Sequence, residues 1–297
     1  MAVNGAGTPR SIDLRDLHGG RLTDAWRSFR TAIGLGWAVE SNWSDPFLFA
    51  VYTVAKPLAA ALILVLMFAV ITGGRSGSYL EFLVVGSALW QVVYGVLAGL
   101  VQGILEDRER YRMIKYVVLT PASVFPFLLG RSVARLLISF LAVAVTIVVG
   151  VLFLGVELRP NPLIFAVATL VGVPGVISLG IFMAGWAFQL RQEAWSYPEA
   201  IAGALYLLSG AIFPVDVLPG FLQPVAYVFP TTWWLEASRR GLLGHGAPGV
   251  LGTLPDTLVI GLLVVTTLVA ISIALAAFAW FLRRARYLGT LDMTTSG

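Results

Sequence analysis

The stretch EDRERYRMIKYVVLTPAS, residues 106–123, sets a dense group of charges between two long apolar segments. Its acids and arginines recur at steps of three and four, so opposite charges share a helix face and partly neutralise one another. Tyrosines and a methionine follow, which are residue types enriched in protein interfaces. We therefore predict a helix that docks onto a soluble partner through Glu106, Arg108, Glu109, Arg110, Tyr111 and Lys115. The alternative is a solvated turn whose arginines only fix the membrane topology.

The sequence lacks the motifs of a nucleotide-hydrolysing or metal-dependent enzyme. A phosphate-binding P-loop ends in Gly-Lys-Ser or Gly-Lys-Thr, whereas Lys56 and Lys115 are followed by proline and tyrosine. His18 and His245 have no second ligand at metal spacing, and there is no cysteine. We expect no catalytic residue, no metal site and no cofactor in this chain.

Composition places these residues in a membrane protein, because 58% of the chain is hydrophobic and only 12% is charged. About 20 apolar residues in a helix cross a hydrocarbon core of about 30 Å. Six segments meet this test, and the fifth is the shortest because Pro214 and Pro219 follow it. The predicted fold is an all-α membrane protein with six transmembrane helices, at residues 47–71, 80–105, 125–154, 162–188, 199–213 and 254–282.

The distribution of arginine and lysine predicts the orientation. These residues are frequent before the first span, in the charged stretch and after the last span, so the positive-inside rule places both termini in the cytoplasm. The opposite side carries Arg75, Arg159, Arg239 and Arg240. We predict a multi-pass protein of the cell membrane that contacts lipid headgroups. Nucleic acid is excluded as a partner, since the basic residues form no continuous stripe.

The predicted domains follow from these spans. Residues 1–20 form a flexible tail, 21–46 an amphipathic helix with a linker, 47–284 the transmembrane domain and 285–297 a cytoplasmic tail. The helix is predicted because apolar side chains share one narrow face, namely Leu22, Trp26, Phe29, Ile33 and Trp37. With arginines around the tryptophans, it is expected to lie at the cytoplasmic interface of the membrane. The alternative is a soluble helix packed on another subunit.

The segment between the fifth and sixth spans holds Pro214, Pro219, Pro224 and Pro230. Each proline removes a backbone donor and disfavours helix in the residue before it, so we predict a series of short pieces. Apolar pieces of this kind suggest extracellular re-entrant half-helices. Such half-helices occur within the membrane where protein or a water-filled cavity surrounds them. The alternative is an ordinary extracellular loop that rests on the membrane.

Polar and aromatic side chains inside the spans are candidates for a transport path. They are Ser87, Trp90, Gln91, Tyr94, Tyr206 and Ser209, while an outer gate is assigned to Phe213, Trp233 and Trp234. Interhelical hydrogen bonding is the alternative role for the polar members. The ionisable residues Glu81, Arg135 and Glu199 are expected near span ends, which disfavours an ion-coupled transporter.

Two stretches together resemble the membrane permease subunit of ABC-2 type transporters, a class that includes polysaccharide, teichoic-acid and daunorubicin-resistance-like drug exporters. The first is EDRER followed by LTPAS and by Gly130-Arg131. The second is SGAIFPVDVLPGFLQPVAYVFPTTWWLEASRRGLL, where matching positions are Pro214, Pro219, Pro230, Glu236 and Arg239. The resemblance covers nearly the whole chain beyond about residue 20. It departs at Tyr111-Arg112, where the family often has Gly-Thr, and at Thr231-Thr232, where it often has Leu-Thr.

The resemblance implies that two permeases pair, and that each receives an ATPase subunit that binds ATP and Mg. We expect a homodimer, with a paralogous second permease as the alternative. The charged stretch would be the coupling helix, seated in a cleft of the ATPase. The cargo would be a drug-like, lipid or polysaccharide molecule moved outward. The competing hypotheses are a secondary transporter or channel that acts without an ATPase, and a structural membrane scaffold.

Overall fold

The computed structural model describes residues 21–41, 78–109, 124–187, 189 and 196–288, together with isolated positions between 47 and 67. Most residues in these ranges are helical, the rest form turns and short connections, and no strand occurs in them. Four helices are long and apolar enough to cross a membrane: α4 (Ser78–Glu109), α6 (Val124–Leu154), α7 (Pro162–Ala187) and α12 (Asp256–Leu288). They coincide with the second, third, fourth and sixth predicted spans, so the all-α membrane fold is confirmed. The first predicted span, at 47–71, lies largely outside the described residues.

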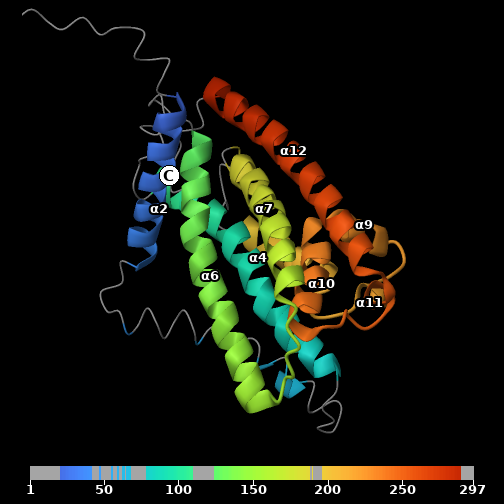
Figure 1. Cartoon of the computed structure of the whole chain (residues 1–297). Helices are drawn as coiled ribbons and strands as arrows, with labels where there is room; N and C mark the ends of the chain where they lie inside the picture. The colour runs from blue at the N-terminus through green and yellow to red at the C-terminus, as the bar shows by residue number, and fades with distance from the viewer. Residues whose placement is uncertain are drawn as a thin grey trace, which may run out of the picture.

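Helix α4 is the centre of the bundle. In its apolar window 83% of the residues are buried, against 22–44% in the other three long helices. It packs against α6 and α7 and against the short helix α10 (Pro230–Leu243), and the helices lie side by side in Figure 1. Its burial on several sides explains why its apolar residues do not form one stripe. The helix continues to Glu109, so the beginning of the charged stretch is part of the same rigid rod.

Helix α10 is enclosed by protein, with every residue from 231 to 240 buried. It approaches α7 closely, because two glycines leave space at the crossing. A Cβ atom added to Gly172 of α7 would lie 2.0 Å from Cδ1 of Trp234, and one added to Gly241 of α10 would lie 2.7 Å from Cβ of Phe165. Tight packing of this kind leaves no room for even one methyl group.

The fifth predicted span is not a membrane-crossing helix in the structure. Helix α8 runs only from Tyr197 to Leu208, a length of about 18 Å at 1.5 Å per residue. It ends before Gly210, whose φ of 72° is a left-handed conformation that glycine adopts without strain. Glu199 contacts Tyr94, and Tyr206 contacts Trp90. Helix α8 therefore runs antiparallel to α4 and lies beside only part of the length of α4.

The proline-rich segment breaks into short pieces, as predicted. They are η1 (Val215–Val217), α9 (Gln223–Val228), α10 and α11 (Val250–Thr253). Pro224 and Pro230 occupy the first turns of α9 and α10, where the missing N–H has no intrahelical partner to lose. Figure 1 shows α9, α10 and α11 gathered around the N-terminal part of α12.

The predicted N-terminal helix is present as α2 (Arg21–Ser41). It packs alongside α6 (Figure 1), and the two helices approach closely at Gly130, where an added Cβ would lie 2.6 Å from Cβ of Ala32. Ala32 is fully buried, whereas Trp26 and Trp37 are 63% and 49% exposed. The face toward α6 is therefore centred on small residues instead of the tryptophans. Location of α2 at the membrane interface stays a prediction.

The Gly172→Ala substitution should destabilise the fold. The added methyl group would collide with the buried indole of Trp234, and overpacking of this kind costs about 1–3 kcal/mol. We expect a lower midpoint of thermal unfolding for the protein in detergent. Gly261→Ala in α12 is the matched control, because open space surrounds its Cβ position, and its midpoint should stay the same or rise. Equal midpoints for the two variants would contradict this packing.

Candidate functional site

Three charged side chains lie inside the protein on α10. Glu236, Arg239 and Arg240 have exposed fractions of 0%, 2% and 5%. A buried charge is costly unless it is paired and hydrogen-bonded. The contacts of these residues therefore identify what they hold in place.

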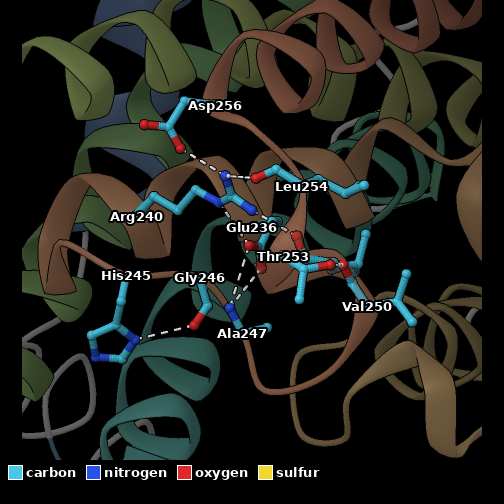
Figure 2. Close-up of polar contacts among 10 residues, drawn as sticks. Glu236, Arg240, His245, Gly246, Ala247, Val250, Thr253, Leu254 and Asp256 are labelled. Carbon is cyan, nitrogen blue, oxygen red and sulfur yellow. Dashed lines mark hydrogen bonds and ion pairs between the residues drawn. The ribbon is translucent and has the colours of Figure 1, made fainter.

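Arg240 joins α10 to the beginning of α12. Its Nε lies 2.8 Å from Oε1 of Glu236, and Nη1 lies 2.6 Å from Oδ1 of Asp256. The guanidinium also donates to the carbonyl oxygen of Leu254 at 2.7 Å (Figure 2) and to that of Leu251 at 2.6 Å. Burial lowers the pKa of Arg240, but the hydrogen bonds to Glu236 and Asp256 outweigh burial and raise it. The side chain is a permanent cation that closes the turn containing α11.

Glu236 extends this connection on its other side. The backbone N–H of Ala247 donates to its two carboxylate oxygens at 3.1 and 3.3 Å (Figure 2). Glycine at 246 permits the approach, because a Cβ there would lie 2.5 Å from Oε1 of Glu236. In the same region the N–H of Val250 donates to Oδ2 of Asp216 at 2.6 Å. Carboxylates thus satisfy one backbone donor at the start of α11 and one in the connection that precedes it.

Arg239 joins α10 to the end of α8 and to α4. Its Nη2 donates to the carbonyl oxygens of Gly210 at 2.7 Å and Ala211 at 3.0 Å. The guanidinium lies 4.0 Å from the centre of the Phe82 ring, a cation–π contact. Gly86 of α4 leaves the space, since a Cβ there would lie 2.5 Å from Nη2. Burial lowers the pKa of Arg239 to about 10, so it remains protonated at neutral pH.

These contacts correct one step of the orientation argument. The predicted orientation counted Arg239 and Arg240 as charges of an extracellular loop. Both arginines are in fact buried and bound to protein groups. A charge that protein neutralises and shields does not report on the membrane side of a loop. The predicted orientation therefore rests on the remaining arginines and stays a prediction.

The candidate path residues divide into two groups. Trp90 of α4 packs against Tyr206 of α8 with ring centres 4.8 Å apart. Ser87 and Ser209 are buried, and their hydroxyl groups donate to carbonyl oxygens of nearby residues in the chain, Val84 at 3.1 Å and Tyr206 at 3.5 Å. The hydroxyl groups of the two serines thus bond to backbone groups nearby in the chain and do not link α4 to α8. The aromatic residues instead pack between α4 and α8.

Tyr94 and Glu199 belong to the same face of α4 and α8. The hydroxyl group of Tyr94 donates to Oε1 of Glu199 at 2.7 Å, and Gln91 lies half-buried one turn earlier on α4. Tyr94 is near the middle of the candidate membrane-crossing segment Tyr79–Glu106. Glu199 is therefore beside the centre of a span, and its expected place near a span end was wrong. The error arose because α8 is a half-length helix.

The three candidate gate residues have different surroundings. Phe213 follows α8 in a turn, with 37% of its surface exposed. Trp233 is buried, and its indole N–H donates to the carbonyl oxygen of Tyr227 at 2.8 Å. Trp234 is fully buried against Gly172. The two tryptophans thus hold α10 against α9 and α7, and the gate assignment stays a prediction.

The charged stretch is described only at its beginning. Glu106 is half-buried on α4, and the backbone of Arg108 and Glu109 continues that helix. Arg110, Tyr111 and Lys115 lie outside the described residues. Within the described ranges, no three histidine, aspartate or glutamate side chains gather into a group that could hold a metal ion.

Residues 35–243 match the family model described as ABC-2 type transporter, a range that includes α4, α8 and all of α10. The chain belongs to the ABC-2 type transporter family. It is similar to the inner membrane transport permease YadH of Escherichia coli strain K12, with 24% identity over 203 residues, covering 65% of this chain and 77% of the relative. YadH of Shigella flexneri matches with the same values. This ABC-2 permease is a membrane transport subunit, and its family implies an ATPase partner and a second permease.

Sequence reasoning placed Glu236 and Arg239 in the family pattern but assigned them no physical role. The available signal was the pair Glu236 and Arg240, which are four residues apart in a helix between apolar segments. At that spacing the two charges meet. The ion pair of Arg240 with Asp256 could not be predicted from the sequence, because only the fold brings these two residues together.

Removal of Arg240 should destabilise this ABC-2 permease strongly. Arg240→Met leaves the buried carboxylate of Glu236 without its cation, and loss of one partner from a buried pair costs about 3–5 kcal/mol. We expect a large fall in the thermal unfolding midpoint and faster proteolysis between α10 and α12. Arg159→Gln is the matched control, because Arg159 and Glu157 form a pair that is 76% and 74% exposed, and such pairs contribute about 0–1 kcal/mol. Similar midpoints for the two variants would contradict the role of Arg240.

Proposed function

We propose that this permease exports a drug-like, lipid or polysaccharide cargo, powered by two separate ATPase subunits that bind ATP and Mg. The observation that carries the proposal is the continuity of α4. The helix runs without interruption from Ser78 at one end of the bundle to Glu109 inside the charged stretch. Motion applied to the charged end would therefore reach the centre of the bundle.

The packing of α4 supports its role as a lever. It contacts α6, α7, α8 and α10, and it contains no proline at which the helix could bend. A long buried helix moves as one body, since interior packing leaves few voids to absorb a displacement. Closure of the ATPase subunits on ATP would push this rod and shift its neighbours.

The remaining parts of the proposal follow from the same arrangement. A second copy of the permease completes the assembly, and the face of α4 and α8 with Trp90, Tyr94 and Tyr206 lines the path. Helices α9 and α10 form re-entrant half-helices on the outer side, consistent with backbone enclosed by protein. Both termini lie in the cytoplasm, and the complex resides in the cell membrane.

A second candidate function is secondary transport without an ATPase. The position of Glu199 beside the middle of α4 favours it, because ionisable groups at that depth often serve as proton or cation sites. Purification in mild detergent separates the two candidates. The exporter requires a soluble partner that carries Gly-Lys-Ser or Gly-Lys-Thr, whereas a secondary transporter moves solute along a gradient with no such partner.

Replacement of Glu106 and Glu109 by alanine should uncouple the permease from its ATPase. The substitutions remove charges at the cytoplasmic end of the proposed lever without altering the apolar span. We expect ATP hydrolysis stimulated by the permease to fall at least several-fold in reconstituted membranes. The quantity to measure is the ATPase rate per inserted complex.

Glu157→Ala is the matched control for this measurement. Glu157 is an exposed acid whose N–H donates to Glu81, at the opposite end of α4. Its replacement should leave the ATPase rate unchanged. An unchanged rate in the Glu106 and Glu109 variant, with normal insertion, would count against the coupling role.

A further inference from the structure

The face between α4 and α8 places a carboxylate among aromatic rings at the depth of a span centre. Glu199 is exposed, and its Oε1 accepts the hydrogen bond of Tyr94 at 2.7 Å. Within the part of the chain that the structure describes, this hydroxyl group is the hydrogen-bond partner of the carboxylate. Tyr94 is a neutral donor, so it does not balance the negative charge.

The neighbouring aromatic groups lie along the same side of the two helices. On α8, Glu199, Gly203 and Tyr206 recur at steps of four and three, which places them on one helix face. Tyr206 packs on Trp90 of α4, with an angle of 33° between the rings. Together with Tyr94, these rings form an aromatic wall beside the carboxylate.

Gly203 leaves an opening between the carboxylate and the aromatic pair. It is exposed, and among the residues that the structure describes no atom lies within 4 Å of the position that its Cβ would occupy. Each α8 neighbour on that face is one helical turn away. A group bound there would contact both Glu199 and Tyr206.

A positive charge from the neighbouring helix α6 lies on another side of α4. The side chain of Arg135, from α6, packs over Gly99, where an added Cβ would lie 2.9 Å from its Cδ. Gly99 is five residues after Tyr94, about 140° around the helix at 100° per residue. Arg135 has contacts of its own, and no atom of the described residues lies within 4 Å of the Cβ position at Gly203. It therefore does not occupy the opening beside Gly203.

We propose that this face binds the cationic group of an amphipathic cargo, with Glu199 as its counter-ion and Trp90, Tyr94 and Tyr206 as its aromatic contacts. Organic cations are attracted to the faces of aromatic rings and to carboxylates. The surrounding apolar surface suits the hydrophobic part of such a molecule. The inference rests on the proposed transport path, and it selects cationic drug-like or lipid molecules over neutral polysaccharides.

The test is equilibrium binding of radiolabelled tetraphenylphosphonium to the full chain with its ATPase in lipid nanodiscs, without ATP. Empty nanodiscs correct for partition of the probe into lipid. We expect saturable binding that triphenylphosphine oxide, a neutral analogue, does not displace. Glu199→Gln should weaken the affinity at least tenfold.

Two further variants make the result specific. Gly203→Leu keeps the carboxylate and fills the opening, so it should also weaken the affinity at least tenfold while leaving the helix intact. Glu157→Gln removes an equivalent charge from an exposed loop and should bind the probe as the unmodified protein does. Absence of saturable binding, or an affinity in the Glu199→Gln or Gly203→Leu variant equal to that of the unmodified protein, would overturn the proposal.

These outcomes are separate from those of the transport hypothesis. Binding is measured without nucleotide, so it does not depend on coupling through Glu106 and Glu109. Loss of coupling with retained cation binding would refute the ATP-driven mechanism alone. Stimulated ATP hydrolysis without cation binding would refute the cation site alone and leave the exporter in place.

Discussion

Backbone groups buried inside a protein must find their partners there, and the architecture around α10 depends on how that requirement is met. Short helices leave carbonyl oxygens unpaired at their ends. Arg239 donates to two of them after α8, and Arg240 donates to two more around α11. The arginines are buried because their ligands are backbone carbonyls inside the protein. Glu236 and Asp256 then balance the charge of Arg240. The charged residues of α10 thus permit a chain of short, broken helices in the protein interior.

The break in the chain also determines the surface of α4. A full-length fifth span would cover α4 from end to end, whereas α8 stops after 12 residues. Glu199, in the first turn of this half-length helix, therefore lies beside the middle of α4 instead of near its end. Gly210 ends α8 at the point where Arg239 binds the carbonyl oxygens. The position of the carboxylate and the binding of the buried arginine are consequences of the same helix end.

Sequence reasoning succeeds here where the controlling interaction is local. The intrahelical hydrogen bonds required in lipid make long apolar runs into helices, which located α4, α6, α7 and α12. Prolines located the breaks at α9 and α10 for an equally local reason. Sequence reasoning failed where a residue contacts another residue that is distant in the sequence. Arg240 meets Asp256 only after α11 turns the chain, and Gly172 fits Trp234 only when α7 and α10 cross. The position of Glu199 relative to α4 depends on where α8 ends. Gly210 marks that end, but the sequence prediction relied on Pro214 and Pro219 and extended the helix to residue 213.

The same contacts constrain how a push on α4 could act. Near one end, Phe82 and Gly86 of α4 pack directly against Arg239. This arginine is held by α10, and α10 is held to α12 by Arg240 and to α7 by Trp234. Sliding α4 past α10 would break a cation–π contact and close the space at Gly86, which a packed interior resists. A displacement of α4 would therefore carry α10 with it. Under the proposed mechanism, the outer short helices move together with the lever, and the face of Trp90, Tyr94 and Glu199 opens or closes where α4 meets the lightly packed α8.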